Sequence, residues 1–134
     1  DEIDISEKMS STNTGMYLCL ALNYGGRAEI TNAVRKIAKQ AVDGDIAIDD
    51  INDDTITGSL YTAGVPDPDL VVRTSGELRV SNFLLWQISY AELYVTETLW
   101  PDFDETEFHK ALTAFSERNR RFGGLNDDDD ANSK

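Results

Sequence analysis

Two arginines and several small polar residues stand close together in residues 73–87, which read RTSGELRVSNFLLWQ. Arg73 directly follows an apolar run, and Arg79, Ser81 and Asn82 come soon after it. Guanidinium groups are forked, permanently charged donors that suit phosphate oxygens. Serine and asparagine are good helix N-caps, and the free amides of a helix N-terminus attract anions. We therefore predict a local anion pocket in this segment.

A second segment, LNYGGRAEI at residues 22–30, suits the same kind of site. Gly25 and Gly26 allow the backbone to turn tightly out of a strand, and Arg27 lies in the first turn of the helix that we expect next. In an open parallel sheet, ligands bind at the carboxyl ends of the strands, where loops lead into helices. We expect both segments to occupy such positions.

Each of these residues also has a purely structural alternative. Arg73 could simply pair with Glu77, and Ser81 or Asn82 could do no more than cap a helix. The two glycines could form a plain turn. Glu92 could be a solvated charge at a strand edge, and His109 could be a surface residue of a helix. Trp86 and Trp100 could serve only in packing, and Arg120–Arg121 could only complement the dipole at a helix C-terminus. Residue types and spacing alone thus predict an anion-binding α/β domain.

Strands are predicted where apolar or β-branched residues run together. The continuous apolar run at 16–22 predicts a strand buried on both faces, as in a parallel sheet, and its single cysteine, Cys19, is then a buried small residue. Shorter runs predict strands at 70–72 and 92–96. With helices between them, these strands predict the α/β class, a parallel sheet with flanking helices.

Helices are predicted at 26–42 and, more weakly, at 49–60 and 83–90. The apolar face of the first is Ile30, Val34, Ile37, Ala38 and Ala41. The last helix has the clearest signals: a capping box of Asp104 with Glu107, the apolar stripe Phe108, Ala111, Leu112 and Phe115, and the closing pair Gly123–Gly124.

Composition excludes several classes of protein. The 134 residues include 25 acidic and 12 basic side chains, a formal net charge of −13, which argues against nucleic-acid binding. One histidine and one cysteine argue against a zinc site. No apolar run approaches the ~20 residues of a membrane span, so we expect a cytoplasmic protein. The first residue is not methionine, and we expect a fragment.

The longer motifs resemble a known family. Residues 67–103, together with LNYGGRAEI and with RNRRFGG at 118–124, closely resemble the carboxyl-terminal half of the cis-prenyltransferases, which include the bacterial undecaprenyl diphosphate synthases. The resemblance implies half of that α/β fold. It also implies a Mg²⁺-dependent condensation of isopentenyl diphosphate with an allylic diphosphate, farnesyl diphosphate in bacteria, to give a long cis-polyprenyl diphosphate lipid carrier.

The same resemblance implies roles for individual residues. Arg73 matches the arginine that holds isopentenyl diphosphate, and Glu92 matches the magnesium ligand. The other matched substrate-binding residues are Arg79, Val80 and Ser81 in a second phosphate-binding segment, Glu77 near the same pocket, and Arg121 with Gly123 in the Arg-x-Gly motif that crosses the subunit interface of a homodimer. Peripheral contact with the inner face of the membrane, through the lipid product, is also implied.

One part of the family pattern has no counterpart here. The His-Gly-Asn-Gly-Arg-Trp type segment, with its preceding catalytic aspartate, resembles nothing in these residues, so no catalytic residue is assigned. We divide the chain into an acidic segment at 1–13, the prenyltransferase part at 14–124 and a disordered acidic tail at 125–134. We expect the chain alone to be inactive. The alternatives are a non-catalytic partner subunit of a prenyltransferase complex and an unrelated phosphate-binding module.

Overall fold

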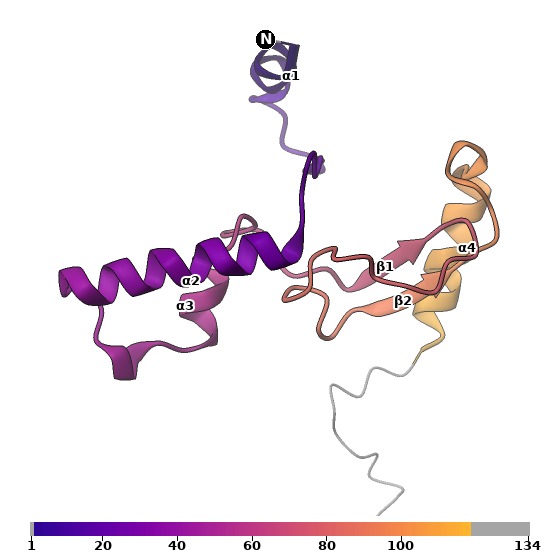
Figure 1. Ribbon diagram of the computed structural model, residues 1–134. Coiled ribbons are helices and arrows are strands. Elements are labelled where there is room, and N and C mark those ends of the chain that lie inside the picture. The colour runs from indigo at the N-terminus through magenta and orange to yellow at the C-terminus, as the bar shows by residue number, and fades with distance from the viewer. Residues whose placement is uncertain (1, 119–134) are drawn as a thin grey trace, which may run out of the picture.

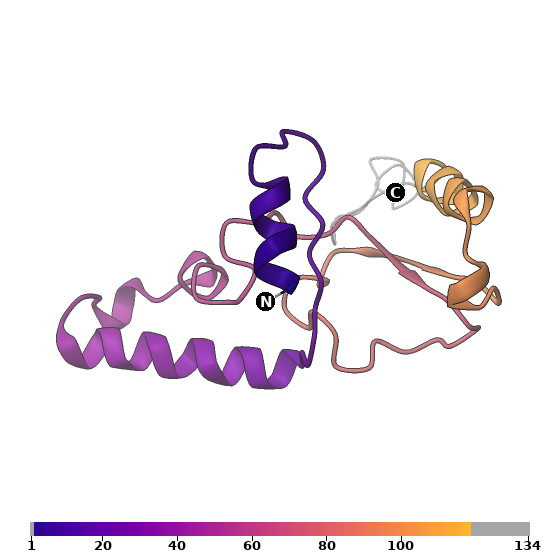
Figure 2. The same cartoon turned by 90° about the horizontal axis from the view of Figure 1, so that it is seen from above.

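The structure is a computed structural model, and it describes residues 2–118. Figure 1 shows two groups of elements: α2 and α3 lie together, and a small sheet lies beside α4. Figure 2 shows the same grouping from above. The elements are α1 (Glu2–Ser10), α2 (Gly26–Asp43), the 3₁₀ turn η1 (Ile48–Asp50), α3 (Asp53–Thr57), β1 (Leu70–Arg73), β2 (Glu92–Val95), the 3₁₀ turn η2 (Trp100–Asp102) and α4 (Glu105–Ser116).

The sheet of the described residues consists of two parallel strands. Leu70 of β1 lies opposite Glu92 of β2, and Arg73 lies opposite Val95. The helix α4 packs against β2. Two predicted strands and the parallel α/β architecture are therefore confirmed. The register decides that Arg73 and Glu92 lie at opposite ends of this sheet.

The predicted helix at 26–42 is confirmed as α2, and its predicted apolar face is only partly correct: Ile37 is buried, Ile30 and Ala41 are half-buried, and Ala38 is exposed. The fully buried positions are Gly26, Glu29, Ala33 and Ile37, whereas Val34 is 58% exposed. The face is rotated because polar and small residues of α2 pack toward the loops around residues 61 and 82–87. The helix ends at Gly44, whose φ of 81° is the left-handed conformation that glycine adopts readily.

The predicted strand at 16–22 is wrong for the residues that the structure describes. The segment belongs to neither strand of the sheet, and its large side chains are exposed, 89% at Met16, 94% at Tyr17 and 75% at Leu18. Cys19 is likewise exposed, not buried. A strand needs a neighbour to receive its hydrogen bonds, and neither β1 nor β2 pairs with this segment. In Figure 1 it rises from the start of α2 toward α1.

Two other predicted helices also differ from the structure. Residues 83–90 form successive turns because Leu84 has a left-handed φ of 44°, which interrupts a right-handed helix. The segment 49–60 divides into η1 and the short helix α3. Asn52 and Thr55 form a capping box at the start of α3, and this side-chain cap starts a new helix within the segment.

The final helix starts where the sequence predicts. Asp104 Oδ1 accepts the Glu107 amide 3.0 Å away, but the Glu107 carboxylate turns to other partners and leaves the capping box incomplete. Of the apolar stripe, Ala111 is fully buried, while Phe108 is 46% exposed. The helix α4 ends at Ser116, and the predicted stop at Gly123–Gly124 lies outside the described residues.

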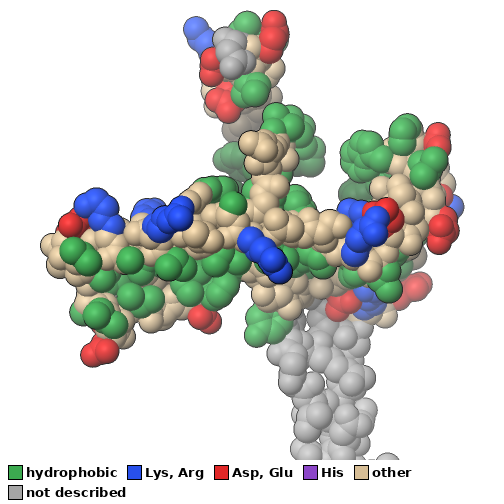
Figure 3. All heavy atoms as spheres, viewed as in Figure 1, with side chains coloured by type: hydrophobic (Ala, Val, Ile, Leu, Met, Phe, Trp, Pro, Cys, Tyr) green, Lys and Arg blue, Asp and Glu red, His purple; other side chains and the backbone are tan. Residues whose placement is uncertain are grey.

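Few apolar side chains are fully buried. Within residues 2–118 the buried hydrophobic residues are Ala33, Ile37, Leu60 and Ala111. Figure 3 shows hydrophobic side chains open to solvent over several elements, with Lys and Arg gathered along α2. No helix in this part of the chain is both long enough and apolar enough to span a bilayer.

Candidate functional site

Two arginines meet on one carboxylate just after β1. Glu77 Oε2 accepts hydrogen bonds from Arg73 Nη2 and, at 3.1 Å, from Arg79 Nε, while Glu77 Oε1 accepts from Arg79 Nη2. The Arg73 hydrogen bond, and then Arg79, lower the pKa of Glu77 against the opposing effect of burial. The cluster is partly open to solvent, since the exposed fraction is 32% for the Arg73 side chain and 63% for Arg79. Within this group of three side chains two cations surround one anion, and a second carboxylate, that of Glu97, lies beside the same turn against Gly76.

The structure thus contains the ion pair of Arg73 with Glu77 that was the structural alternative for Arg73, and it adds Arg79 to that pair. Arg73 Nε is buried and has no hydrogen-bond partner within the described residues. A buried donor without a partner is costly, and an anionic oxygen would satisfy it. The pair is therefore compatible with anion binding: the carboxylate holds the two guanidinium groups together, and each retains free donors.

The turn that carries Glu77 has an unusual backbone. Ser75 and Gly76 both have left-handed φ angles, 68° and 65°. Their amides donate to the carbonyl oxygens of Thr98 (3.0 Å) and Thr96 (2.9 Å) beyond β2. These two bonds tie the turn after β1 to the segment after β2. The carboxylate of Glu97 lies against Gly76, in the space that a β-carbon would take.

Ser81 and Val80 are not drawn into the arginine cluster. Ser81 has a left-handed φ of 52°, its side chain forms no hydrogen bond within residues 2–118, and Val80 is 38% exposed. Asn82 is a cap, as predicted, but of a different helix. Its backbone oxygen accepts the Gly26 amide (2.8 Å) and its Oδ1 accepts the Arg27 amide (2.9 Å), both at the start of α2.

The two predicted glycines are explained by this contact. A β-carbon on Gly25 would come within 2.8 Å of Asn82 Nδ2. One on Gly26 would come within 3.0 Å of the Leu85 side chain and 3.3 Å of the Asn82 oxygen. The glycines therefore let the loop at 82–85 approach the start of α2 closely. This close approach connects the two segments that the sequence predicts as phosphate-binding.

Glu92 lies apart from the arginine cluster. Its position in the register is offset from that of Arg73 by three residues, which is about 10 Å along the sheet. Its Oε2 accepts a hydrogen bond from Arg118 Nη1 at 2.7 Å, and the same nitrogen reaches the Leu93 oxygen at 3.0 Å. The part of the chain that the structure describes holds no group of three His, Cys, Asp or Glu that could bind a metal ion. Arg121 and Gly123 lie outside that part.

A second polar cluster surrounds Glu29, which is only 1% exposed. Its carboxylate accepts from Tyr24 Oη, from the Tyr61 amide (2.8 Å) and from Gln87 Nε2 (3.2 Å). Burial, and then the hydrogen bond to Glu29, raise the pKa of Tyr24 to about 12. Sequence reasoning missed this cluster because a glutamate in a helix of mixed polarity is ordinarily solvated.

Two hollows lie near these elements. One, of about 430 Å³, is lined mainly by apolar residues such as Leu20, Leu22, Val65 and Phe83. The other, of about 570 Å³, lies along α4 beside Thr106 and His109. His109 is 3.6 Å from Glu105 on the surface of α4, as its structural alternative predicts. Neither of these two hollows is lined by Arg73, Arg79 or Ser81.

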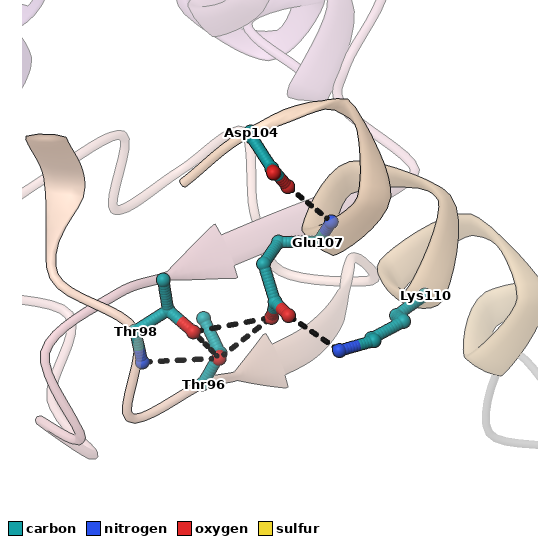
Figure 4. A network of polar contacts seen from close by, with 5 residues as sticks. All are labelled: Thr96, Thr98, Asp104, Glu107 and Lys110. Atoms are coloured by element: carbon teal, nitrogen blue, oxygen red, sulfur yellow. Dashed lines mark hydrogen bonds and ion pairs between the residues drawn. The ribbon is translucent and has the colours of Figure 1, made fainter. Parts of the chain in front are cut away.

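A third polar network joins α4 to the end of β2 (Figure 4). The Glu107 carboxylate accepts from Thr98 Oγ1 (3.1 Å), from Thr96 Oγ1 (3.5 Å) and from Lys110 Nζ (2.5 Å). The Lys110 hydrogen bond is the main cause that lowers the pKa of Glu107. The sequence signals at Glu107 indicated only a helix cap, so this network was not predicted.

Comparison with known proteins decides the family. The prenyltransferase family model described as undecaprenyl diphosphate synthase matches residues 1–123. The chain belongs to this family. The isoprenyl transferase of Rhodopirellula baltica is 52% identical over 125 residues, 93% of this chain and 51% of the relative. The ditrans,polycis-undecaprenyl-diphosphate synthase ((2E,6E)-farnesyl-diphosphate specific) of Pasteurella multocida is 48% identical over 124 residues, 92% of this chain and 52% of the relative.

Solved structures of the family share the fold described above. Lavandulyl diphosphate synthase from Lavandula x intermedia, solved in complex with dimethylallyl diphosphate, has a TM-score of 0.86 at 42% identity and covers 90% of this chain and 52% of its own. A probable undecaprenyl diphosphate synthase from Campylobacter jejuni has a TM-score of 0.74 at 35% identity, over 91% of this chain and 54% of its own. The chain thus spans about half the length of the relatives it matches.

Proposed function

We propose that this chain supplies the isopentenyl diphosphate site of a cis-prenyltransferase of the undecaprenyl diphosphate synthase type, as the carboxyl-terminal half of that enzyme. The observation that carries the proposal is the meeting of Arg73 and Arg79 on Glu77 at the carboxyl end of β1, in a chain that belongs to the family. Ligands of parallel α/β sheets bind at this end of the strands.

The cluster can bind a diphosphate through donors that are already in place. Glu77 orients both guanidinium groups, so less side-chain freedom is lost when an anion arrives. Arg73 Nε is an unsatisfied buried donor, and Arg79 is largely exposed. Ser81 follows Arg79 closely in the chain and is proposed to add a hydroxyl donor on substrate binding, since its side chain forms no hydrogen bond within the described residues. Arg121 and Gly123 would reach the same head group from the second subunit of a homodimer.

The proposed magnesium ion would be shared with the substrate rather than enclosed by the protein, because the described residues do not bring Glu92 into the arginine cluster: it lies at the opposite end of the sheet from Arg73. Mg²⁺ prefers oxygen ligands and is commonly held by one or two carboxylates together with phosphate oxygens and water. Glu92 is the carboxylate proposed for this role, and it would have to release Arg118, to which it is now bonded. When bound, magnesium would neutralise charge on the diphosphate groups.

The proposed reaction joins isopentenyl diphosphate to an allylic diphosphate, and a relative's name specifies farnesyl diphosphate. The residues of this chain would hold the isopentenyl diphosphate by its head group, so that its double bond is positioned for attack on the allylic carbon. The allylic site and the catalytic aspartate would come from the other half of the enzyme. The apolar segment 16–22, exposed here, supports a fold completed by further chain. A cytoplasmic enzyme at the membrane surface is consistent with the lipid product.

Titration with isopentenyl diphosphate tests the proposal directly. Arg73→Ala and Arg79→Ala each remove a charge-assisted donor, so calorimetry should show affinity weakened roughly 10- to 100-fold. Arg35→Ala is the matched control, because Arg35 is an exposed arginine on α2 that bonds only to Asn32 in the described part of the chain. We expect no change for that variant.

ATP and a turnover assay separate the alternatives. The wild-type chain should bind isopentenyl diphosphate more tightly than ATP, and alone it should release no polyprenyl product. Equal binding of ATP would favour a general phosphate-binding module. An affinity for isopentenyl diphosphate that is the same in Arg73→Ala and in the wild type would overturn the assignment. Absence of binding in the wild type would favour a partner subunit without a substrate site.

A further inference from the structure

The network around Glu107 lies outside the proposed substrate site but is connected to it. Glu107 belongs to α4, and the side chains of Thr98 and Thr96 that donate to it follow β2 directly. Figure 4 shows these two threonines turned toward the Glu107 carboxylate, with Lys110 on its other side. The Glu107 side chain is only 18% exposed. This carboxylate therefore fixes the segment 96–98 against α4.

The same segment holds the turn that carries Glu77. The carbonyl oxygens of Thr96 and Thr98 accept the amides of Gly76 and Ser75 at 2.9 and 3.0 Å. Ser75 is not a glycine, yet it has a left-handed φ of 68°. Such a conformation costs about 1 kcal/mol or more and persists only where neighbouring contacts impose it. The two hydrogen bonds from the 96–98 segment are such contacts.

We propose that Glu107 is a positioning residue for the diphosphate site. Through Thr96 and Thr98 it fixes the two carbonyl oxygens that hold the turn at 75–76, and this turn directs Glu77 between the two arginines. The proposal rests on the function proposed above for Arg73 and Arg79. It gives α4 a part in substrate binding although α4 contributes no phosphate-binding group.

A charge effect and a positioning effect predict opposite results. Removing a negative charge from the neighbourhood of an anion site should tighten the binding of an anion. Loss of positioning should weaken it, because the guanidinium donors no longer converge. Glu107→Ala removes both the charge and the hydrogen bonds. Glu107→Gln removes the charge but keeps an amide oxygen that can accept from Thr98.

Inorganic pyrophosphate is a suitable probe, measured by calorimetry on the whole 134-residue chain. We expect Glu107→Ala to weaken its binding about tenfold, the equivalent of roughly one lost hydrogen bond. Glu107→Gln should stay within about threefold of the wild type, which is the rescue expected of a hydrogen-bonding role. Glu105→Ala is the matched control: Glu105 is an 89% exposed carboxylate on the same helix whose side chain pairs, among the described residues, only with His109, and its loss should change nothing.

Amide hydrogen exchange gives a second readout that needs no ligand. Glu107→Ala, and the milder Thr98→Val, should speed exchange of the Ser75 and Gly76 amides while leaving that of the β1 amides unchanged. Thr98→Val serves if Glu107→Ala fails to fold. Pyrophosphate affinity that is unchanged or higher in Glu107→Ala, or unchanged exchange at Ser75 and Gly76, would overturn the proposal. If the wild type binds no pyrophosphate, the proposed substrate site fails, and the exchange rates still decide whether Glu107 holds the turn.

Discussion

Asn82 provides a sharp test of how the loop after β1 is coupled to α2. Its Oδ1 accepts the Arg27 amide at 2.9 Å, in the position where a side-chain cap acts, while the N-cap residue of α2 itself, Gly25, has no side chain. Asn82→Ala removes this cap, at a cost of about 1 kcal/mol. It also places alanine at a φ of 61°, for roughly 1 kcal/mol more. The free energy of unfolding should fall by about 2 kcal/mol.

Three further variants separate the two contributions. Asn82→Asp keeps the acceptor and adds a favourable charge at the helix N-terminus, so its stability should lie within about 0.5 kcal/mol of the wild type. Asn82→Gly loses the cap without the left-handed strain, at about 1 kcal/mol. Asn23→Ala is the matched control for strain alone: Asn23 has a φ of 51° and its side chain forms no hydrogen bond within residues 2–118.

Urea unfolding followed by far-ultraviolet circular dichroism measures these differences, because α2 is the longest helix of the described residues. The order of stability should be wild type and Asn82→Asp, then Asn82→Gly, then Asn82→Ala. If Asn82→Asp is destabilised as much as Asn82→Ala, the Oδ1 hydrogen bond does not contribute and the capping role is refuted. Equal losses in Asn82→Ala and Asn23→Ala would attribute the whole effect to the backbone.

Two pH-dependent predictions follow from the other polar clusters. Arg73 lowers the pKa of Glu77 in the folded chain, so the wild type should be more stable than Glu77→Gln above pH 4.5. It should lose that advantage as the pH falls through the lowered pKa of Glu77. A stability advantage that stays constant from pH 7 to about pH 2 would contradict the ion pairing. Because burial raises the pKa of Tyr24 to about 12, one phenol of the folded chain should ionise near that pH. The stabilisation that the protonated Tyr24 side chain provides should be present below pH 10 and lost as the pH rises through 12. Spectrophotometric titration of the wild type and of Tyr24→Phe measures this, and an ordinary pKa for Tyr24 would show that its bond to Glu29 is absent.

Local signals predicted much of the secondary structure. The apolar runs at 70–72 and 92–96, the helix 26–42 and the Asp104 cap are properties of neighbouring residues, and each is found in the structure. The signals failed where a distant partner decides the outcome. Residues 16–22 have strand composition but no neighbour within the described residues, and Leu84 adopts a left-handed φ that no sequence pattern indicated.

The candidate site shows the same division. Arginine side chains suit a diphosphate, and the sequence places Arg73 four residues before Glu77 and Arg79 two residues after it. Because this stretch of chain is short, both arginines can reach the Glu77 carboxylate. The buried polar groups were not predictable in this way. Glu29 is bonded to Gln87, 58 residues away, so its partner becomes visible only when the chain is folded.

By itself, the sequence determined the chemistry of this protein: the charged groups, their order along the chain and the family to which they belong. The tertiary structure alone decided which groups act together. Asn82 caps α2 rather than the segment that follows it, Glu107 reaches the turn before Glu77 through two threonines, and Glu92 lies at the opposite end of the sheet from Arg73. The physical reason is that hydrogen bonds and strand register depend on distance in space, and contacts between residues far apart in sequence leave no local pattern to read.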